Sequence, residues 1–314
     1  MHKEVLTNRL FGYFWLLSDK NMNVLTIQQL KKSYGPIQAL KSFSLEIPAG
    51  SVYGILGPNG SGKTTMLSIL TGILNADSGD FNWFNGEQAE TARKRIGAII
   101  ETPNFYPYLS AVDNLKIVAK IKDVDESRIE VVLNQVGLLE RKNSAFKTYS
   151  LGMKQRLSLA SCLLADPEVL VLDEPTNGLD PQGIAEIRNI ILDVAKQGKT
   201  IIIASHILAE VQKICNYVAI LRKGELLTSG TIAEVLSTEG VIEVSADNME
   251  KLTEALKVWT QGGEVVQQNG SLKVVTTANP AELNKYLFDK GIVANKLVQY
   301  QSDLEEEFLK LVNA

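Results

Sequence analysis

The sequence is poor in cysteine, has no long apolar run and carries no excess of positive charge, and each shortage excludes a class of protein. The two cysteines, Cys162 and Cys215, both lie inside apolar helical patterns, so we expect small buried side chains rather than a disulfide or a metal site. No apolar run approaches the ~20 residues that cross a bilayer, so work at a membrane would need another chain to span it. The net charge of −4 argues against a nucleic-acid partner, because such proteins usually present a basic face.

The sequence does contain a glycine-rich loop around which the rest of the chain can be arranged. The loop reads Gly57-Pro58-Asn59-Gly60-Ser61-Gly62-Lys63-Thr64-Thr65 and fits the phosphate-binding pattern G-x-x-x-x-G-K-[ST]. An apolar run at 51–56 precedes it and apolar residues at helical spacing follow over 65–70, which predicts a strand, a loop and a helix. Glycines let backbone N–H groups surround a phosphate, and the helix N-terminus adds positive charge. Lys63 supplies a point charge for the outer phosphates, and Thr64 supplies a hydroxyl for Mg²⁺.

Three further strand ends carry candidate chemistry, and the strand ends of an open α/β sheet meet in one crevice. Glu101 follows the run 95–100, Asp173 and Glu174 end the run 169–172, and His206 follows the run 200–204. An apolar strand that ends in aspartate suits Mg²⁺, and Glu174 can take a proton from a water that attacks the γ-phosphate. His206 can donate to the γ-phosphate and sense its presence.

The remaining patterns give the domain organisation. The length of 314 residues, with 45% apolar residues, allows one large or two ordinary domains. We expect an N-terminal extension at 1–22, a P-loop domain at 23–237 and an accessory domain at 240–314. Within the P-loop domain we predict short antiparallel strands at 24–27 and 43–47 on either side of a loop that includes residues 32–35, and a helical subdomain over about 104–165. Ser150 stands where a helix N-cap would.

In the last part of the chain the pattern of apolar residues changes and predicts interspersed strands and helices. We predict strands over 241–246, 264–268, 271–277 and 292–300, and helices over 248–259, 280–290 and 304–312. The order β-α-β-β-α-β is ferredoxin-like, with Asn269-Gly270 as a tight hairpin turn between the middle strands. No catalytic cluster is visible there, so we expect a small α+β accessory domain.

Three interpretations compete for residues 1–22. The apolar run at 10–17 is too short to span a membrane and lacks the cleavage site of a signal peptide. The segment is a tail that docks on a partner or a membrane surface, a disordered extension, or the product of a start codon chosen upstream of Met22. We favour the last two.

Together these motifs resemble the nucleotide-binding subunit of ABC transporters over about residues 23–237. The matching parts are the P-loop, the Walker B run 169–174, the signature Tyr149-Ser150-Leu151-Gly152-Met153, the loop 177–180 and the switch His206. Tyr34 falls where that family places its base-stacking aromatic, although taken alone it would more often be a half-buried tyrosine. The resemblance implies an α/β P-loop fold with a RecA-like mixed sheet, an antiparallel β subdomain and a helical insertion. It also implies ATP and Mg²⁺ as cofactors.

The resemblance further implies a head-to-tail homodimer that closes over two ATP molecules. One ATP would meet Lys63, Thr64, Asp173, Glu174 and His206 of one subunit. Ser150 and Gly152 would approach the same ATP from the other subunit. Hydrolysis would reopen the dimer and drive a separate membrane permease, which implies a position at the cytoplasmic face of the cell membrane.

Two departures from the family pattern bear on this expectation. Leu151 and Met153 stand where glycine and glutamine are usual in the signature, and Glu101 replaces the usual lid glutamine. The loop 99–107 is similar to that of the bacitracin- and lantibiotic-resistance branch. The similarity implies that Glu101 could still reach Mg²⁺ or the attacking water, while the loop beyond it would contact the membrane subunit. The run 304–309 resembles the tails of drug- and sodium-export ATPases, which favours export.

Two rival functions use the same P-loop. A soluble regulatory ATPase or translation factor of this class usually carries two cassettes in one chain, and this chain has one. A P-loop GTPase or kinase has no role for the signature at 150–155, and the guanine-reading motif Asn-Lys-x-Asp is missing from the sequence.

Overall fold

The computed structural model describes residues 22–101, 104–236, 240–260, 265–268, 270–276, 278–300 and 304–313. Its contacts divide the chain into two compact units between Ser229 and Gly230. The division falls a few residues before the predicted boundary at 237, because helix α9 (Ile232–Val235) contacts helix α12 (Leu304–Asn313) and so belongs with it to the second unit. The predicted extension at 1–22 lies, except for Met22, outside the described residues.

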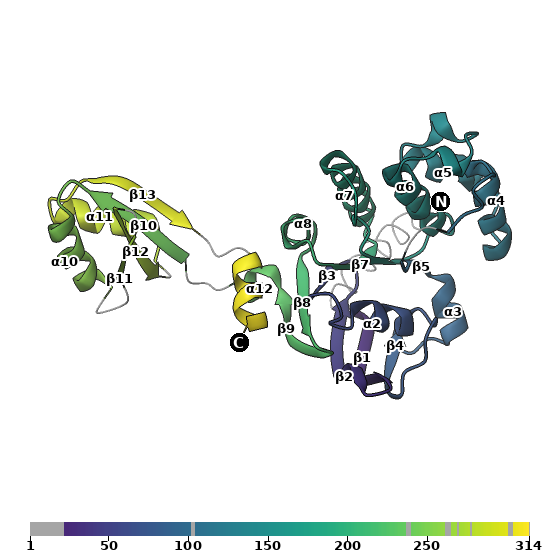
Figure 1. The fold of residues 1–314 in the computed structure, drawn as a ribbon, viewed down its shortest axis with the longest axis horizontal. Helices are drawn as coiled ribbons and strands as arrows, with labels where there is room; N and C mark the ends of the chain where they lie inside the picture. Colours follow the sequence, from purple (N-terminus) through teal and green to yellow (C-terminus); the bar gives the residue numbers. More distant parts are fainter. Residues whose placement is uncertain are drawn as a thin grey trace, which may run out of the picture. The chain divides into compact units, whose positions relative to one another are not determined.

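The first unit is built on a six-stranded sheet with the order β5-β6-β7-β3-β8-β9 (Figure 1). The strands are β3 (Val52–Leu56), β5 (Ile96–Ile99), β6 (Val169–Asp173), β7 (Thr200–Ser205), β8 (Tyr217–Arg222) and β9 (Glu225–Thr231). The first five run parallel, and a two-residue turn joins β8 to β9. Every residue of β3, β6 and β7 is buried, as expected for apolar strands covered on both faces. The strands predicted in this part of the chain are confirmed.

A second sheet of three antiparallel strands has the order β2-β1-β4. Its strands are β1 (Asn23–Tyr34), β2 (Ile37–Pro48) and β4 (Ser78–Trp83). The predicted loop at 32–35 is wrong, because β1 continues to Tyr34 and pairs it with Ile37 across a tight turn. Register shifts near Gln29 (φ 49°), whose N–H bonds the Ser44 hydroxyl, interrupt the alternation of side chains. A bulge of this kind hides a continuous strand from a period-2 pattern.

Helices cover these sheets and form the insertion. They are α2 (Lys63–Leu70), α3 (Ala89–Lys94), α4 (Ala111–Lys122), α5 (Arg128–Gln135), α6 (Leu151–Leu163), α7 (Pro181–Ala195) and α8 (Leu208–Ile214), with the short 3₁₀ helices η1 (Leu139–Arg141) and η2 (Phe146–Thr148). The predicted helical insertion is confirmed, and α4, α5 and α6 gather beside the β5 end of the sheet (Figure 1). Ser150 is the N-cap of α6, as predicted, and its hydroxyl accepts a hydrogen bond from the N–H of Met153.

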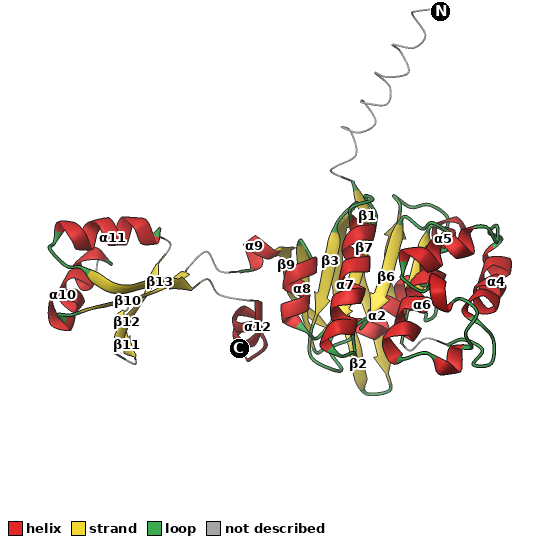
Figure 2. Ribbon diagram, turned by 90° about the horizontal axis from the view of Figure 1, so that it is seen from above, coloured by secondary structure: helices red, strands yellow, loops and turns green. Residues whose placement is uncertain are grey.

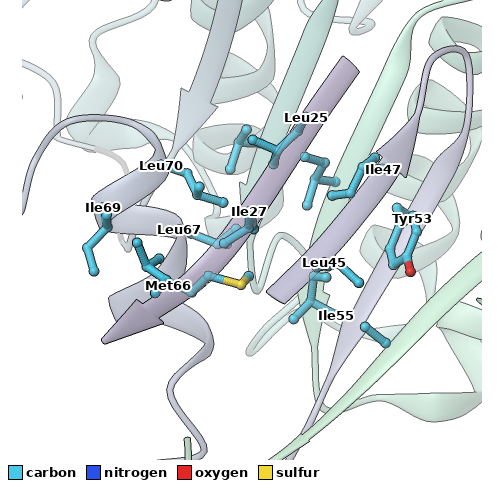
Figure 3. Close-up of a cluster of buried hydrophobic side chains, with 14 of the residues drawn as sticks. Leu25, Ile27, Leu45, Ile47, Tyr53, Ile55, Met66, Leu67, Ile69 and Leu70 are labelled. Carbon is cyan, nitrogen blue, oxygen red and sulfur yellow. The ribbon is translucent and has the colours of Figure 1, made fainter. Parts of the chain in front are cut away.

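Helix α2 is buried between the two sheets. Figure 3 shows its apolar side chains beside those of β1, β2 and β3. The buried side chains of α2 in this core are Met66, Leu67, Ile69 and Leu70, which are at most 2% exposed. Burying a side chain of this size contributes about 1.5–3 kcal/mol. The indole N–H of Trp83 also donates to the carbonyl of Leu70 at 2.9 Å and satisfies the end of the helix. The helix that follows the glycine loop is therefore held firmly.

The second unit contains a four-stranded antiparallel sheet with the order β11-β12-β10-β13. Its main elements are β10 (Gly240–Ala246), α10 (Met249–Trp259), β11 (Val265–Gln268), β12 (Ser271–Thr276), α11 (Pro280–Asp289), β13 (Ala294–Tyr300) and α12. Figure 2 shows helices α10 and α11 with the strands of this unit. The element order β-α-β-β-α-β and the terminal helix are as predicted, while the ferredoxin-like classification stays a prediction. In the predicted hairpin turn Gly270 has φ 77°, and Asn269 lies outside the described residues.

An acid with a strongly lowered pKa lies on the sheet of the second unit. Glu243 of β10 is 8% exposed and accepts hydrogen bonds from Lys296 at 2.7 Å and from Tyr300 at 2.8 Å. The Lys296 ammonium, with the Tyr300 and Ser271 hydroxyls, lowers the pKa of Glu243 to about 2. A lowered pKa in the folded state stabilises the unit above the unfolded-state pKa of ~4.3, and this stabilisation is lost as the pH falls toward the folded-state value.

We therefore predict that Glu243→Gln weakens the acid sensitivity of the second unit. Hydrogen exchange of β10 and β13 peptides, corrected for intrinsic rates, would be compared at pH 5 and pH 3. The wild type should lose more protection between these pH values than the variant, because only the wild type has a carboxylate at position 243 to protonate. Peptides from β3 and β6 serve as the internal control and should behave alike in both proteins. Equal losses in β10 would contradict the prediction.

Candidate functional site

The predicted strand ends lie together at one edge of the six-stranded sheet. Leu56 of β3 pairs with Ser205 of β7, and Asp173 of β6 pairs with Ala204. The P-loop, the Asp173-Glu174 pair and His206 therefore leave neighbouring parallel strands side by side. Glu101 follows β5, the next strand along, and its negative charge contributes to the electrostatics of Asp173.

The P-loop requires two of its glycines, Gly57 and Gly62, for steric reasons. A Cβ on Gly57 would lie 2.4 Å from the Ser61 hydroxyl oxygen and 2.5 Å from the carbonyl oxygen of Leu221. Gly62, at φ 108°, would place a Cβ 2.4 Å from the carbonyl oxygen of Ala39. The main chains of β2 and β8 thus lie directly against the loop and leave no room for a side chain at these two positions. Sequence reasoning missed these two carbonyls, since a main-chain group leaves no signal in the pattern of side chains.

The Lys63 side chain folds back onto the main chain of the P-loop. The Lys63 side chain is 6% exposed, and its ammonium donates to the carbonyl oxygens of Gly57 at 2.7 Å and Pro58 at 3.4 Å. Burial lowers the pKa of Lys63, while the carboxylates of Glu174 and Asp173 oppose that shift. The Lys63 ammonium lies 3.7 Å from the Glu174 carboxylate. The site therefore contains a partly desolvated cation, which an anionic ligand would stabilise.

The two acids at the end of β6 have different partners. The Thr64 hydroxyl donates to one oxygen of Asp173 at 2.7 Å, while the other oxygen, Oδ1, is buried without a hydrogen-bond partner. Asp173 is 4% exposed, and burial raises its pKa. Glu174 contacts His206, with 2.8 Å between Oε2 and the ring Nδ1. The buried Asp173 Oδ1 atom is an unsatisfied acceptor, which marks a place for a cation or donor.

Glu174 also has an unusual backbone conformation. Its φ of 48° lies in the left-handed region, which costs free energy for a residue with a side chain. Its N–H donates to the carbonyl of Ala204 at 2.9 Å, which holds the turn that follows Asp173. Strain of this kind concentrates at functional sites, so this turn supports a functional reading of Glu174.

Two predicted site residues lie in a separate cleft of about 460 Å³. Ser150 and Gly152 line it together with residues 178–180 and the start of α7, and no P-loop residue is among those that line it. The nearest atom to a Cβ on Gly152 would be Leu179 Cδ2 at 3.9 Å, so contacts within the chain do not require a glycine there. The structure therefore unites Lys63, Thr64, Asp173, Glu174 and His206, and leaves the signature residues apart.

Two further features predicted from the sequence are Tyr34 and the loop that follows Glu101. Tyr34 ends β1 and is 46% exposed, so it is neither buried nor free of the sheet. The loop after Glu101 passes through residues 102 and 103, which lie outside the described residues. Beyond them the Asn114 side chain, 2% exposed, binds the N–H and carbonyl of Tyr106 at 2.9 and 3.1 Å. Sequence reasoning missed Asn114, and the available signal was an amide on the buried face of α4.

The strand, glycine loop and helix, with aspartate and glutamate at the end of a nearby strand, define a P-loop nucleotide-binding fold. The family profile described as "ABC transporter" matches residues 40–177. The chain is 37% identical over 300 residues to the "Uncharacterized ABC transporter ATP-binding protein YdbJ" of Bacillus subtilis, which covers 93% of this chain and 96% of that one. It is 33% identical over 296 residues to the "Bacitracin transport ATP-binding protein BcrA" of Enterococcus faecalis, covering 92% and 96%.

Other relatives cover the ATPase part. The "Lantibiotic transport ATP-binding protein SrtF" of Streptococcus pyogenes is 45% identical over 204 residues, covering 65% of this chain and 89% of that one. The solved structure of cbiO1 from Clostridium perfringens, part of the ABC transporter complex cbiONQ, is 31% identical with a TM-score of 0.62, covering 68% and 90%. The chain belongs to the ABC transporter ATP-binding proteins, and it is an ATP-binding and ATP-hydrolysing subunit of a transporter. The predicted resemblance to this family and to its bacitracin and lantibiotic branch is confirmed. None of the described helices is long and apolar enough to cross a membrane.

We predict that Gly57→Ala destabilises the ATPase unit by about 1–3 kcal/mol, the usual cost of overpacking, since the new Cβ meets the main chain of β8. Urea unfolding of the full chain, with ATP binding measured alongside, checks this. Gly152→Ala is the matched control and should keep the stability of the wild type, because its Cβ has room. A Gly57→Ala protein as stable as the wild type would show that the loop adapts.

Proposed function

We propose that two copies of this chain bind two Mg²⁺–ATP complexes between them and power a separate membrane permease that exports antimicrobial peptides or drugs. The observation that carries the proposal is the cluster at the sheet edge, in which Lys63, Glu174 and His206 form one set of contacts and Thr64 and Asp173 form another.

The P-loop is the proposed binding site for the phosphates of ATP. The backbone N–H groups of residues 57–65 and the N-terminus of α2 would surround them, and Lys63 would supply a positive charge. The Thr64 hydroxyl and the Asp173 carboxylate offer the oxygen ligands that Mg²⁺ prefers, and the unsatisfied Asp173 Oδ1 supports this fit. When bound, Mg²⁺ would neutralise charge on the phosphates; Glu101 is a third candidate ligand.

Glu174 is the proposed general base. Water attacks the γ-phosphorus, the bond to the bridging oxygen of ADP breaks, and the water proton moves to the Glu174 carboxylate. His206 holds this carboxylate through Nδ1, which leaves its Nε2 for the γ-phosphate. Lys63, 3.7 Å from Glu174, keeps positive charge where negative charge develops.

The other half of each site is proposed to come from the partner subunit. The cleft that holds Ser150 and Gly152 is separate from the P-loop, so a second copy is needed to bring a signature to an ATP. The space beside Gly152 and the positive N-terminus of α6 suit the close approach of a phosphate. Tyr34, exposed at the end of β1, is the proposed platform for the adenine base.

The proposed permease contact is the loop that follows Glu101. Tyr106 and Tyr108 are 62% and 79% exposed, and Asn114 holds the loop that carries them. Exposed aromatic side chains on a fixed loop are typical anchors for a protein partner. The relatives named for bacitracin and lantibiotic transport support antimicrobial peptides as cargo, and the chain would then work at the cytoplasmic face of the membrane. Co-expression with a candidate membrane protein from a neighbouring gene tests this: ATP-driven export in vesicles supports it, and an ATPase that binds no such protein favours the regulatory alternative.

We predict that Glu174→Gln lowers ATP turnover by about 10²–10⁴-fold while ATP binding persists, since the change removes only the proton acceptor. Gel filtration should then show a dimer that depends on ATP. Asp193→Asn, an exposed acid on α7 paired with Lys196, is the control and should hydrolyse ATP normally. Undiminished turnover in Glu174→Gln would exclude Glu174 as the base.

We predict that Ser150→Arg lowers hydrolysis by on the order of 100-fold, the usual cost of losing a transition-state contact. ATP binding to the monomer, measured by calorimetry, should stay unchanged because the target of Ser150 lies on the other subunit. Asn134→Arg adds the same charge to an exposed position of α5 and is the control. A weaker ATP affinity of the Ser150→Arg monomer would instead indicate a role within one subunit.

A further inference from the structure

We propose that Asp77 is a positioning residue for Tyr34, holding its ring where an adenine base can stack. The inference rests on the proposed role of Tyr34 in nucleotide binding. Asp77 lies in the turn directly before β4.

One residue, Asp77, is joined to three consecutive residues of β1 that precede Tyr34. Its N–H donates to the carbonyl of Lys31 at 2.8 Å. One carboxylate oxygen accepts from the N–H of Ser33 at 2.6 Å, and the other accepts from the ammonium of Lys32 at 2.9 Å. These bonds approach β1 from the side of β4, whereas Tyr34 itself pairs with Ile37 on the opposite side, in β2.

The position of Asp77 explains why a side chain is needed here. The main-chain ladder between β1 and β4 ends at the pair Lys31–Ser78. The last residues of β1, including Tyr34, run beyond that ladder. The Asp77 carboxylate extends the support to Ser33, the residue next to Tyr34, where β4 no longer supplies carbonyl groups. It therefore restrains the main chain that aims the half-exposed tyrosine ring.

The charge of Asp77 has a second consequence. The Lys32 and Ser33 hydrogen bonds lower the pKa of Asp77, so its carboxylate is charged at neutral pH. It holds the Lys32 ammonium, which lies 5.9 Å from the centre of the Tyr34 ring. A cation at that distance is attracted to an aromatic face. The ammonium already lies over the ring, and Asp77 fixes its position there, so loss of Asp77 would leave Lys32 free to shift across the face that the base would use.

The test separates binding of the base from binding of the phosphates. Calorimetry on the full chain would give dissociation constants for ATP and for inorganic tripolyphosphate, which has no base. In Asp77→Ala we expect ATP affinity to fall roughly 3- to 10-fold, while tripolyphosphate affinity stays within about twofold of the wild type. Asp80→Ala is the control, because the Asp80 side chain bonds the N–H of its own neighbour Phe81, and both affinities should stay unchanged.

A second pair of variants shows whether Asp77 acts through Tyr34. Tyr34→Ala should weaken ATP binding alone, and adding Asp77→Ala to it should cause no further loss. Asp77→Asn keeps an acceptor for Ser33 but loses the charge, so its effect should be intermediate, and it serves if Asp77→Ala folds poorly. If the Asp77 variants weakened the binding of ATP and of tripolyphosphate equally, or if the two substitutions had additive effects, this inference would be overturned. The proposed role of Tyr34 would not be affected by either result. A Tyr34→Ala protein with unchanged ATP affinity would overturn the proposed role of Tyr34 and the inference with it.

Discussion

The nucleotide site depends on the burial of one short helix between two sheets. Helix α2 places most of its apolar side chains in the core shared by the parallel and antiparallel sheets (Figure 3). Because this face is held, the loop before it cannot relax outward, and Lys63 begins the helix at a defined point of the sheet edge. The glycines then follow as a requirement, since the carbonyls of Ala39 and Leu221 leave no space for a Cβ. The packing of the core thus determines the shape of the P-loop, the proposed phosphate site.

Burial also sets the electrostatic state of the site. Lys63 and Asp173 are both nearly inaccessible, and desolvation opposes the charged form of each. Their partners within the chain offset this only in part, because the Lys63 ammonium is shared among carbonyls and Glu174, and one Asp173 oxygen has no partner. A bound triphosphate and its cation would supply the missing charges. Relief of a desolvation that folding has already imposed would therefore contribute to the free energy of nucleotide binding at the proposed site.

The helical insertion has a different physical role. Its first and last long helices begin at the serine caps Ser110 and Ser150, and the cap of α6 leaves a positive helix end at the signature cleft. The insertion also carries the aromatic loop held by Asn114. One compact group of helices thus presents both the surface proposed for the partner copy and the one proposed for the permease. A movement of the insertion would therefore affect both surfaces together.

Much of this protein could be predicted from local sequence patterns. The P-loop, the apolar strand that ends at Asp173 and the cap at Ser150 are each specified by a few adjacent residues, because glycine conformations, burial and capping act over short distances. The order of elements in the second unit was predictable for the same reason. The true length of β1 was not, because a bulge at Gln29 interrupts the pattern on which the prediction depends.

Tertiary structure alone decided which of these residues meet. The pairing of β6 with β7, and of β7 with β3, brings Glu174 to His206 and to Lys63 across large separations in sequence. The same is true of Asp77, whose contacts with Lys32 and Ser33 join the turn before β4 to the end of β1, two segments that no local pattern relates. Sequence by itself determined the kinds of chemical groups and the elements that carry them. Their distances, their burial and the unsatisfied oxygen of Asp173 arise only when the sheets pack, because each depends on atoms from distant parts of the chain.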